Sequence, residues 1–147
     1  HMIVIVYVDD FIVCSNNIVA TKSLVEVLNR KFSMKDLGAI SLILGIKVER
    51  TESTLRLTQT HYAEETLRRF GMWECNPNRN PLWKGIKLDQ FDSEEKDTEF
   101  PFKQALGSIQ WMAKTTRPDL CTTANKLACF QEHPKNLHEQ GIKSAMR

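Results

Sequence analysis

The chain lacks the features that mark several classes of protein. None of its apolar runs approaches the roughly 20 residues that a helix needs to cross a bilayer, and no signal peptide is evident. Its four cysteines form no CxxC pair, and no histidines accompany them at zinc-ligand spacing. These absences argue against a membrane protein and a structural zinc site. They favour an intracellular protein, cytoplasmic or nuclear, with reduced thiols.

The chain also has little excess of either charge, because its positive and negative side chains are nearly equal in number. The 147 residues include 20 basic and 18 acidic side chains, which leave a net charge of +2. Acidic residues crowd into 89–99, so the remainder of the chain is distinctly basic. A basic body is compatible with phosphate binding and equally with an ordinary solvated surface. Charge alone therefore assigns no partner, and the length allows one domain or two small lobes.

The most informative stretch is 3–14, IVIVYVDDFIVC, in which two apolar runs flank Asp9 and Asp10. Short runs rich in Val, Ile, Tyr and Phe are typical of buried strands. Asp tolerates turn conformations, so the pattern predicts a tight hairpin with both carboxylates at or beside its tip. Two paired strands could hold the carboxylates for Mg²⁺, which prefers oxygen ligands. An ordinary solvent-facing turn is the alternative.

A second hairpin and several helices are predicted downstream. Residues 41–50 and 55–59 have the composition of strands joined by a polar turn. Helical spacing predicts a helix over about 22–31 with Thr21 as its N-cap, its apolar stripe lying across the back of the first hairpin. A further helix is predicted over 60–70, with Glu64–Arg68 and Glu65–Arg69 pairs on its solvated side. A third begins at Pro101. Its predicted buried stripe consists of Phe102, Ala105, Leu106, Ile109, Met112 and Ala113.

Tyr7-Val8-Asp9-Asp10 between apolar strands resembles the catalytic hairpin of reverse transcriptases. The downstream sequence resembles the Copia-type retrotransposon polymerases. The blocks that carry this resemblance, in the family's order, are Met34-Lys35-Asp36-Leu37-Gly38, Leu44-Gly45-Ile46, Leu57-Thr58-Gln59 with Tyr62, Arg69-Phe70-Gly71-Met72, Ala105-Leu106-Gly107-Ser108, and Thr115-Thr116-Arg117-Pro118-Asp119. Together they cover nearly all of the chain after Met2.

The resemblance implies an α+β fold: a partial reverse-transcriptase palm of antiparallel hairpins with a packing helix, followed by a helical thumb or connection lobe. We expect the C-terminal part of the palm over 2–59, with the catalytic hairpin and a primer-grip hairpin. The first thumb helix is expected over 60–73 and a polar, acidic linker over 74–100. The helical thumb or connection lobe is expected over 101–147.

The resemblance also implies the roles of individual residues. Asp9 and Asp10 would be catalytic and would hold Mg²⁺ or Mn²⁺ in a two-metal nucleotidyl transfer. Four residues are expected near the nucleotide or primer: Tyr7, Val8, Leu44 and Gly45. Four basic residues are expected to contact the nucleic-acid backbone: Lys47, Arg56, Arg68 and Arg69. The expected partner is an RNA or DNA primer–template.

By resemblance, the third carboxylate and the fingers belong upstream of this sequence. Two carboxylates on one turn repel each other and would bind a metal weakly or not at all. We therefore expect a fragment of an RNA-directed DNA polymerase that does not synthesise DNA alone. The alternative is a truncated or repurposed module that binds nucleic acid or a protein. We also hypothesise that the exposed hairpin edge at 3–14 recruits a second copy or another partner.

Overall fold

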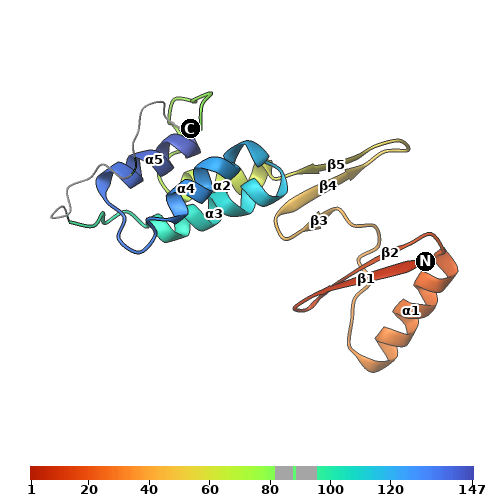
Figure 1. The fold of residues 1–147 in the computed structure, drawn as a ribbon. Helices are drawn as coiled ribbons and strands as arrows, with labels where there is room; N and C mark the ends of the chain where they lie inside the picture. Colours follow the sequence, from red (N-terminus) through yellow and green to blue (C-terminus); the bar gives the residue numbers. More distant parts are fainter. Residues whose placement is uncertain (82–87, 89–95) are drawn as a thin grey trace. The chain divides into compact units, whose positions relative to one another are not determined.

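The computed structural model describes residues 1–81, 88 and 96–147 (Figure 1). The predicted linker over 74–100 therefore lies partly outside the described residues. The chain forms two compact units, His1–Ile43 and Leu44–Arg147. The second hairpin thus belongs to the same compact unit as the later helices, whereas the sequence grouped it with the first hairpin. The assignment of palm and thumb to these parts stays a prediction.

The first unit begins with the predicted hairpin, which is confirmed. Strand β1 (Met2–Tyr7) pairs antiparallel with β2 (Asp10–Ser15), and Tyr7 lies opposite Asp10. Only Val8 and Asp9 remain between the strands, so the loop has two residues, the shortest common hairpin connection. Asp9 therefore lies in the turn itself, and Asp10 is the first residue of β2.

Helix α1 (Ile18–Lys31) starts earlier than predicted. Asn17 is its N-cap, because its side-chain Oδ1 accepts hydrogen bonds from the backbone N–H groups of Val19 at 3.0 Å and Ala20 at 3.1 Å. An asparagine in this position satisfies donors that have no partner within the helix. The predicted cap at Thr21 is wrong, because the Thr21 hydroxyl donates to the Asn17 carbonyl inside the first turn.

The structure describes every residue of the first unit, and none of them is buried. Helix α1 contacts β2 as predicted, yet its side chains all keep some exposure. Residues 3–7 of β1 are exposed and Met2 is half-buried, so the expectation of buried strands is wrong within this unit. The physical reason is the small number of elements: one hairpin, one helix and the two-residue strand at 42–43 cannot enclose a side chain on all sides. Large apolar surfaces therefore stay open on this unit.

The predicted strand over 41–50 is broken in two. Strand β3 (Leu42–Ile43) ends at a turn formed by Leu44 and Gly45, and β4 (Ile46–Arg50) follows. Both turn residues have positive φ, 50° and 76°, which is the pattern of a type I′ hairpin turn. Strand β4 pairs with β5 (Leu55–Thr58), and the sheet has the order β3-β4-β5.

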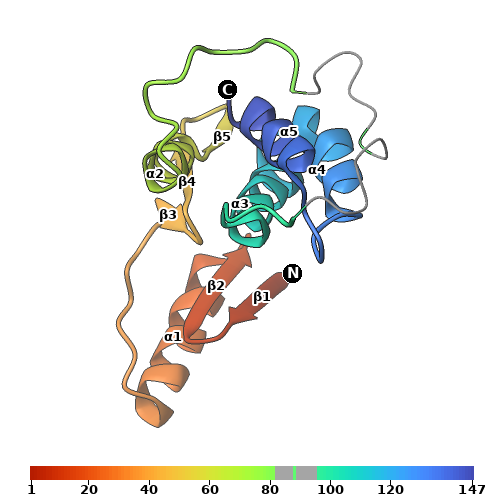
Figure 2. The same ribbon diagram turned by 90° about the vertical axis from the view of Figure 1, so that its left-hand side faces the viewer.

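The second unit is built around α3 (Phe102–Thr115), which contacts α2 (Thr60–Arg69), α4 (Cys121–Ala128) and α5 (Asn136–Met146) (Figures 1 and 2). A short 3₁₀ turn, η1 (Pro118–Leu120), joins α3 to α4. The stripe predicted from the helical spacing is confirmed, since all six of its residues are buried. Sequence periodicity therefore identified the face that α3 contributes to the core correctly.

His138 on α5 is a buried part of this core. Its Nδ1 accepts a hydrogen bond from the Lys135 backbone N–H at 2.8 Å, its Nε2 lies 2.8 Å from the Leu88 carbonyl oxygen, and its ring stacks on Phe130. One nitrogen accepting and the other facing a carbonyl is the pattern of a neutral imidazole. Within the described residues, no group of three potential metal-binding side chains occurs, and no helix is long and apolar enough to span a membrane.

Candidate functional site

The turn that carries the acidic pair has an unusual backbone. Val8 has a φ of 53°, while Asp9 is not among the described residues with positive φ, which is the pattern of a type II′ turn. A β-branched residue in this region is an outlier, because its Cβ approaches the neighbouring carbonyl, at a cost of roughly 1–2 kcal/mol. Val8 is also 79% exposed. The hairpin therefore presents a strained, apolar side chain at its tip beside the two carboxylates.

Asp9 and Asp10 are both exposed. Their carboxylate oxygens are the kind of ligand that Mg²⁺ and Mn²⁺ prefer. They supply only part of the octahedral set that Mg²⁺ demands, and the described part of the chain adds no third acidic, histidine or cysteine side chain to them. The ligand atoms of the turn therefore suit a divalent cation, but the two carboxylates alone do not complete its coordination.

Two of the predicted phosphate contacts lie on one face of the second hairpin. Lys47 on β4 forms an ion pair with Glu49 at 2.7 Å, and Arg56 on β5 lies directly opposite Glu49. The hydrogen bond and charge of Lys47, with the charge of Arg56, lower the pKa of Glu49. Glu49 was not identified from the sequence, although its position two residues after Lys47 places it on the same strand face. Its negative charge partly neutralises the two cations.

The other two predicted contacts, Arg68 and Arg69, are exposed at the end of α2. The Arg68 guanidinium carbon lies 3.7 Å from the ring centroid of Trp73, a cation–π contact. Among the described residues, this contact and a 4.0 Å approach of His61 to Glu65 take the place of the expected Glu64–Arg68 and Glu65–Arg69 pairs. No local sequence signal predicts the Trp73 contact, because the chain turns between the two residues at Gly71.

Leu44 and Gly45, predicted to lie near the primer, form the turn that precedes β4. A Cβ on Gly45 would lie 3.3 Å from the Tyr62 ring atom Cδ2, and the φ of 76° is itself unfavourable for other residues. The turn therefore packs closely on α2, and any other residue in place of Gly45 would be strained. At Gly107 on α3, by contrast, no described atom outside its own helix backbone and chain neighbours lies within 4 Å of the place that a Cβ would occupy.

The predicted residues therefore fall into two groups. Tyr7, Val8, Asp9 and Asp10 share one hairpin tip in the first unit. The others, Leu44, Gly45, Lys47, Arg56, Arg68 and Arg69, belong to the second unit.

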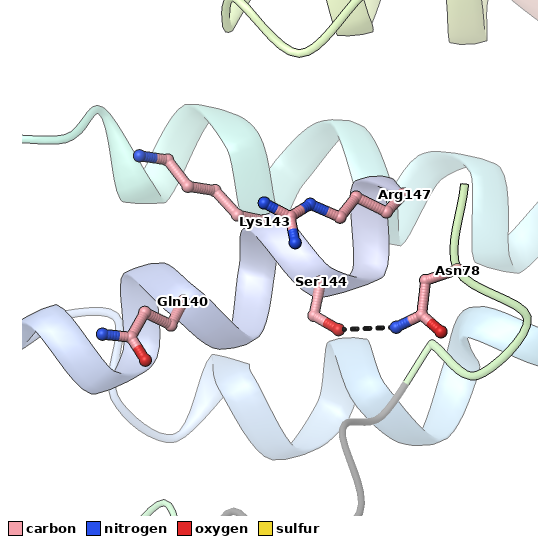
Figure 3. A pocket seen from close by; sticks show the side chains of 5 residues that line it. All are labelled: Asn78, Gln140, Lys143, Ser144 and Arg147. Carbon is pink, nitrogen blue, oxygen red and sulfur yellow. Dashed lines mark hydrogen bonds between the residues drawn. The ribbon is translucent and has the colours of Figure 1, made fainter. Parts of the chain in front are cut away.

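A separate cavity of about 390 Å³ lies beside α5 and contains none of the predicted residues (Figure 3). Its lining consists of Asn78, Gln140, Lys143, Ser144 and Arg147. The Asn78 side-chain Nδ2 donates to the Ser144 hydroxyl at 3.2 Å, and Lys143 is paired with Glu139. The Lys143 and Thr98 hydrogen bonds lower the pKa of Glu139. Three of the lining side chains therefore already have partners within the fold.

Comparison with known proteins assigns the chain to a class of nucleic-acid polymerases. The family model described as reverse transcriptase (RNA-dependent DNA polymerase) matches residues 1–84, which include the acidic hairpin and the Lys47–Glu49–Arg56 face. The chain belongs to this family. Its similarity lies with the Copia-type retrotransposons, as the sequence motifs predicted.

The retrovirus-related Pol polyprotein from transposon TNT 1-94 of Nicotiana tabacum is 33% identical over 99% of this chain and 12% of that protein. The corresponding polyprotein from transposon RE1 of Arabidopsis thaliana is 29% identical over 97% of this chain and 10% of that protein. An uncharacterized mitochondrial protein of Arabidopsis thaliana is 34% identical over 92% of this chain and 55% of that protein. The chain thus spans about a tenth of the polyproteins and about half of the shorter relative. No solved structure matches it.

The strain at Val8 makes a testable prediction. Val8→Gly should remove the unfavourable contact of the Cβ and stabilise the β1–β2 pairing by about 1 kcal/mol. Amide exchange of the hairpin residues, measured by NMR, should slow accordingly. The matched control is Val4→Gly, which lies inside β1 and should weaken the same pairing. Faster exchange in both variants would show that the Val8 backbone is not strained.

Proposed function

We propose that this chain supplies the catalytic hairpin, the primer-contacting hairpin and the duplex-contacting helices of a Copia-type RNA-directed DNA polymerase. The observation that carries the proposal is the two-residue turn of Tyr7-Val8-Asp9-Asp10, which exposes both acids beside a strained Val8 within the segment that matches the family. A divalent cation bound at such acids lowers the pKa of the attacking hydroxyl and neutralises phosphate charge during nucleotidyl transfer.

The residues of the two units would divide this work. Asp9 and Asp10 hold the cation, and Val8 at the tip contacts the end of the primer. In the second unit, Lys47 and Arg56 bind phosphates through charge, and the turn at 44–45 lies near the primer. Arg68 and Arg69 extend the basic surface along α2. The support for these roles is the family match together with the exposure of every charged group concerned.

The first experiment measures binding of a labelled RNA–DNA primer–template duplex across a salt series. We expect tighter binding to the duplex than to single strands, with affinity falling steeply as salt rises, because phosphate contacts release counterions. Glu49→Gln removes the charge between Lys47 and Arg56 and should raise duplex affinity by about threefold at low salt.

The matched control is Glu52→Gln, which removes the same charge from the exposed turn between β4 and β5 and should have a smaller effect. Equal effects of the two substitutions would place the duplex elsewhere. No binding at low salt would contradict the proposed function and direct attention to protein partners.

The acidic turn by itself should bind metal weakly. We expect no saturable Mn²⁺ binding below about 1 mM in calorimetry and no template-dependent primer extension with Mg²⁺ or Mn²⁺, since two adjacent carboxylates form only part of a site. Asp9→Asn together with Asp10→Asn should abolish the residual Mn²⁺-dependent broadening of the hairpin NMR signals, and Glu52→Gln should not. Template-dependent synthesis by the unsubstituted chain would refute this prediction.

We also propose that β1 pairs with β1 of a second copy. Within the described residues, β1 pairs only with β2, and its segment 3–7 contains neither a charge nor a proline that would block strand addition. Like strands can pair antiparallel about a two-fold axis, and an uncharged strand does so without repulsion.

Sedimentation equilibrium at about 100 μM should therefore give the mass of a dimer, with Kd values in the micromolar range typical of small interfaces. Val4→Lys places a charge in the strand and should return the monomer mass, because an edge charge opposes pairing. The control, Leu37→Lys, changes a residue outside the strands that is 80% exposed, and it should leave the dimer intact. A monomer mass for the unsubstituted chain would contradict the proposal.

A further inference from the structure

Two of the sequence blocks that resemble the family meet through one buried side chain. Gln59, which is 5% exposed, lies between β5 and α2, and Thr115 and Thr116 lie at the end of α3. The Gln59 side-chain Oε1 accepts hydrogen bonds from both threonine hydroxyls, from Thr116 at 2.7 Å. The partners are 56 and 57 residues apart in the sequence, so this is a long-range contact.

The number of hydrogens available to these three side chains limits how the Gln59 amide can be oriented. The Thr115 hydroxyl has a single hydrogen, yet it also lies 2.7 Å from the Trp111 carbonyl oxygen. If the Gln59 amide is turned by half a rotation, its two N–H groups face the two hydroxyl oxygens, and the Thr115 hydrogen is free for Trp111. Gln59 bridges both threonines in either orientation. In the orientation of the structure, the amide Nε2 is buried without a partner among the described residues.

The bridge ties the second hairpin to the helices. Gln59 is the N-cap residue of α2, and its own carbonyl accepts from the Ala63 N–H at 2.9 Å. On the same helix, Tyr62 packs on Gly45 in the turn that precedes β4. The position of the turn at 44–45 relative to α3 therefore depends on α2, and α2 is fixed to α3 through Gln59. All of these residues belong to the second compact unit.

A polar side chain is an unfavourable choice here if stability is the only requirement. A buried amide atom without a partner destabilises the fold, and a leucine of similar size would fill the same space without that cost. Apolar contacts, however, have no preferred direction, whereas the two hydrogen bonds between one planar amide and the threonine hydroxyls fix both a distance and an angle. The arrangement therefore gives up stability and gains a defined orientation of the hairpin.

We propose that Gln59, Thr115 and Thr116 form a polar latch that sets the position of the second hairpin against α3, which makes Gln59 a positioning residue for the primer strand. This inference rests on the proposed function insofar as the hairpin contacts the primer. The latch itself is a property of the free chain.

The test compares substitutions that keep or remove the hydrogen bonds. Gln59→Leu removes the amide, and Thr116→Val removes a hydroxyl while keeping the shape of the side chain. Thr116→Ser keeps the hydroxyl and serves as the conservative rescue. Gln104→Leu, on the exposed side of α3, is the matched control for the glutamine. Three quantities are measured: the thermal midpoint, amide exchange over 46–63, and affinity for the RNA–DNA duplex.

We expect Gln59→Leu and Thr116→Val to speed amide exchange over 46–63 by roughly tenfold and to weaken duplex binding by a similar factor. The thermal midpoint of Gln59→Leu should not fall, since the unpartnered buried atom is removed with the amide. Thr116→Ser and Gln104→Leu should behave like the unsubstituted chain. A purely structural role would instead lower the midpoint and speed exchange evenly across the second unit.

The outcomes separate the latch from the proposed function. Unchanged amide exchange over 46–63 in Thr116→Val overturns the latch, whatever the chain binds. If Gln59→Leu does not fold, Thr116→Val alone tests the latch. Localised faster exchange together with no duplex binding by the unsubstituted chain overturns the proposed function and the role of Gln59 toward the primer. Localised faster exchange with unchanged duplex affinity overturns that role alone.

Discussion

The second unit depends on the burial of one face of α3. Phe102, Leu106 and Ile109 are almost completely buried, and helices on several sides contribute to the same cluster. Burial of large apolar side chains of this kind is the dominant stabilising contribution in a small domain. The second hairpin, the basic residues of α2 and the polar bridge at Gln59 all take their positions from elements attached to this helix. A disturbance of the α3 face would therefore reach every candidate contact in the unit.

The first unit differs from the second in having no buried residues. It presents the acidic turn on two paired strands, but it has no interior, and its apolar side chains are open on both the hairpin and α1. An exposed apolar surface of this extent is typical of a region that another polypeptide segment covers. The strained Val8 backbone fits the same view, because unfavourable conformations are commonly found where a site must present particular side chains.

Charge in the candidate interface is moderated by nearby partners. Lys47 and Arg56 flank Glu49, and Arg68 lies against Trp73. Outside the candidate contacts, Arg117 donates three hydrogen bonds to Asp119, and this pairing lowers the pKa of the Asp119 carboxylate. Such contacts orient long basic side chains and reduce the entropy that they would lose on binding a phosphate. The net charge of +2 therefore does not describe where the basic side chains lie or how their neighbours orient them.

The sequence by itself determined the features that depend on local pattern. The apolar spacing from Phe102 to Ala113 predicted the buried face of α3, and the two apolar runs around Asp9 and Asp10 predicted the hairpin and its turn. Asn17 as the cap of α1 and the turn at Leu44–Gly45 were missed, although both are local, because Thr21 and a continuous apolar run offered competing signals. Only the tertiary structure decided that Arg68 lies on Trp73 and that Gln59 reaches Thr115 and Thr116. The Arg68–Trp73 contact depends on the turn of the chain at Gly71. Gln59 and the two threonines are 56 and 57 residues apart, so their contact arises only once packing on α3 brings the segments together.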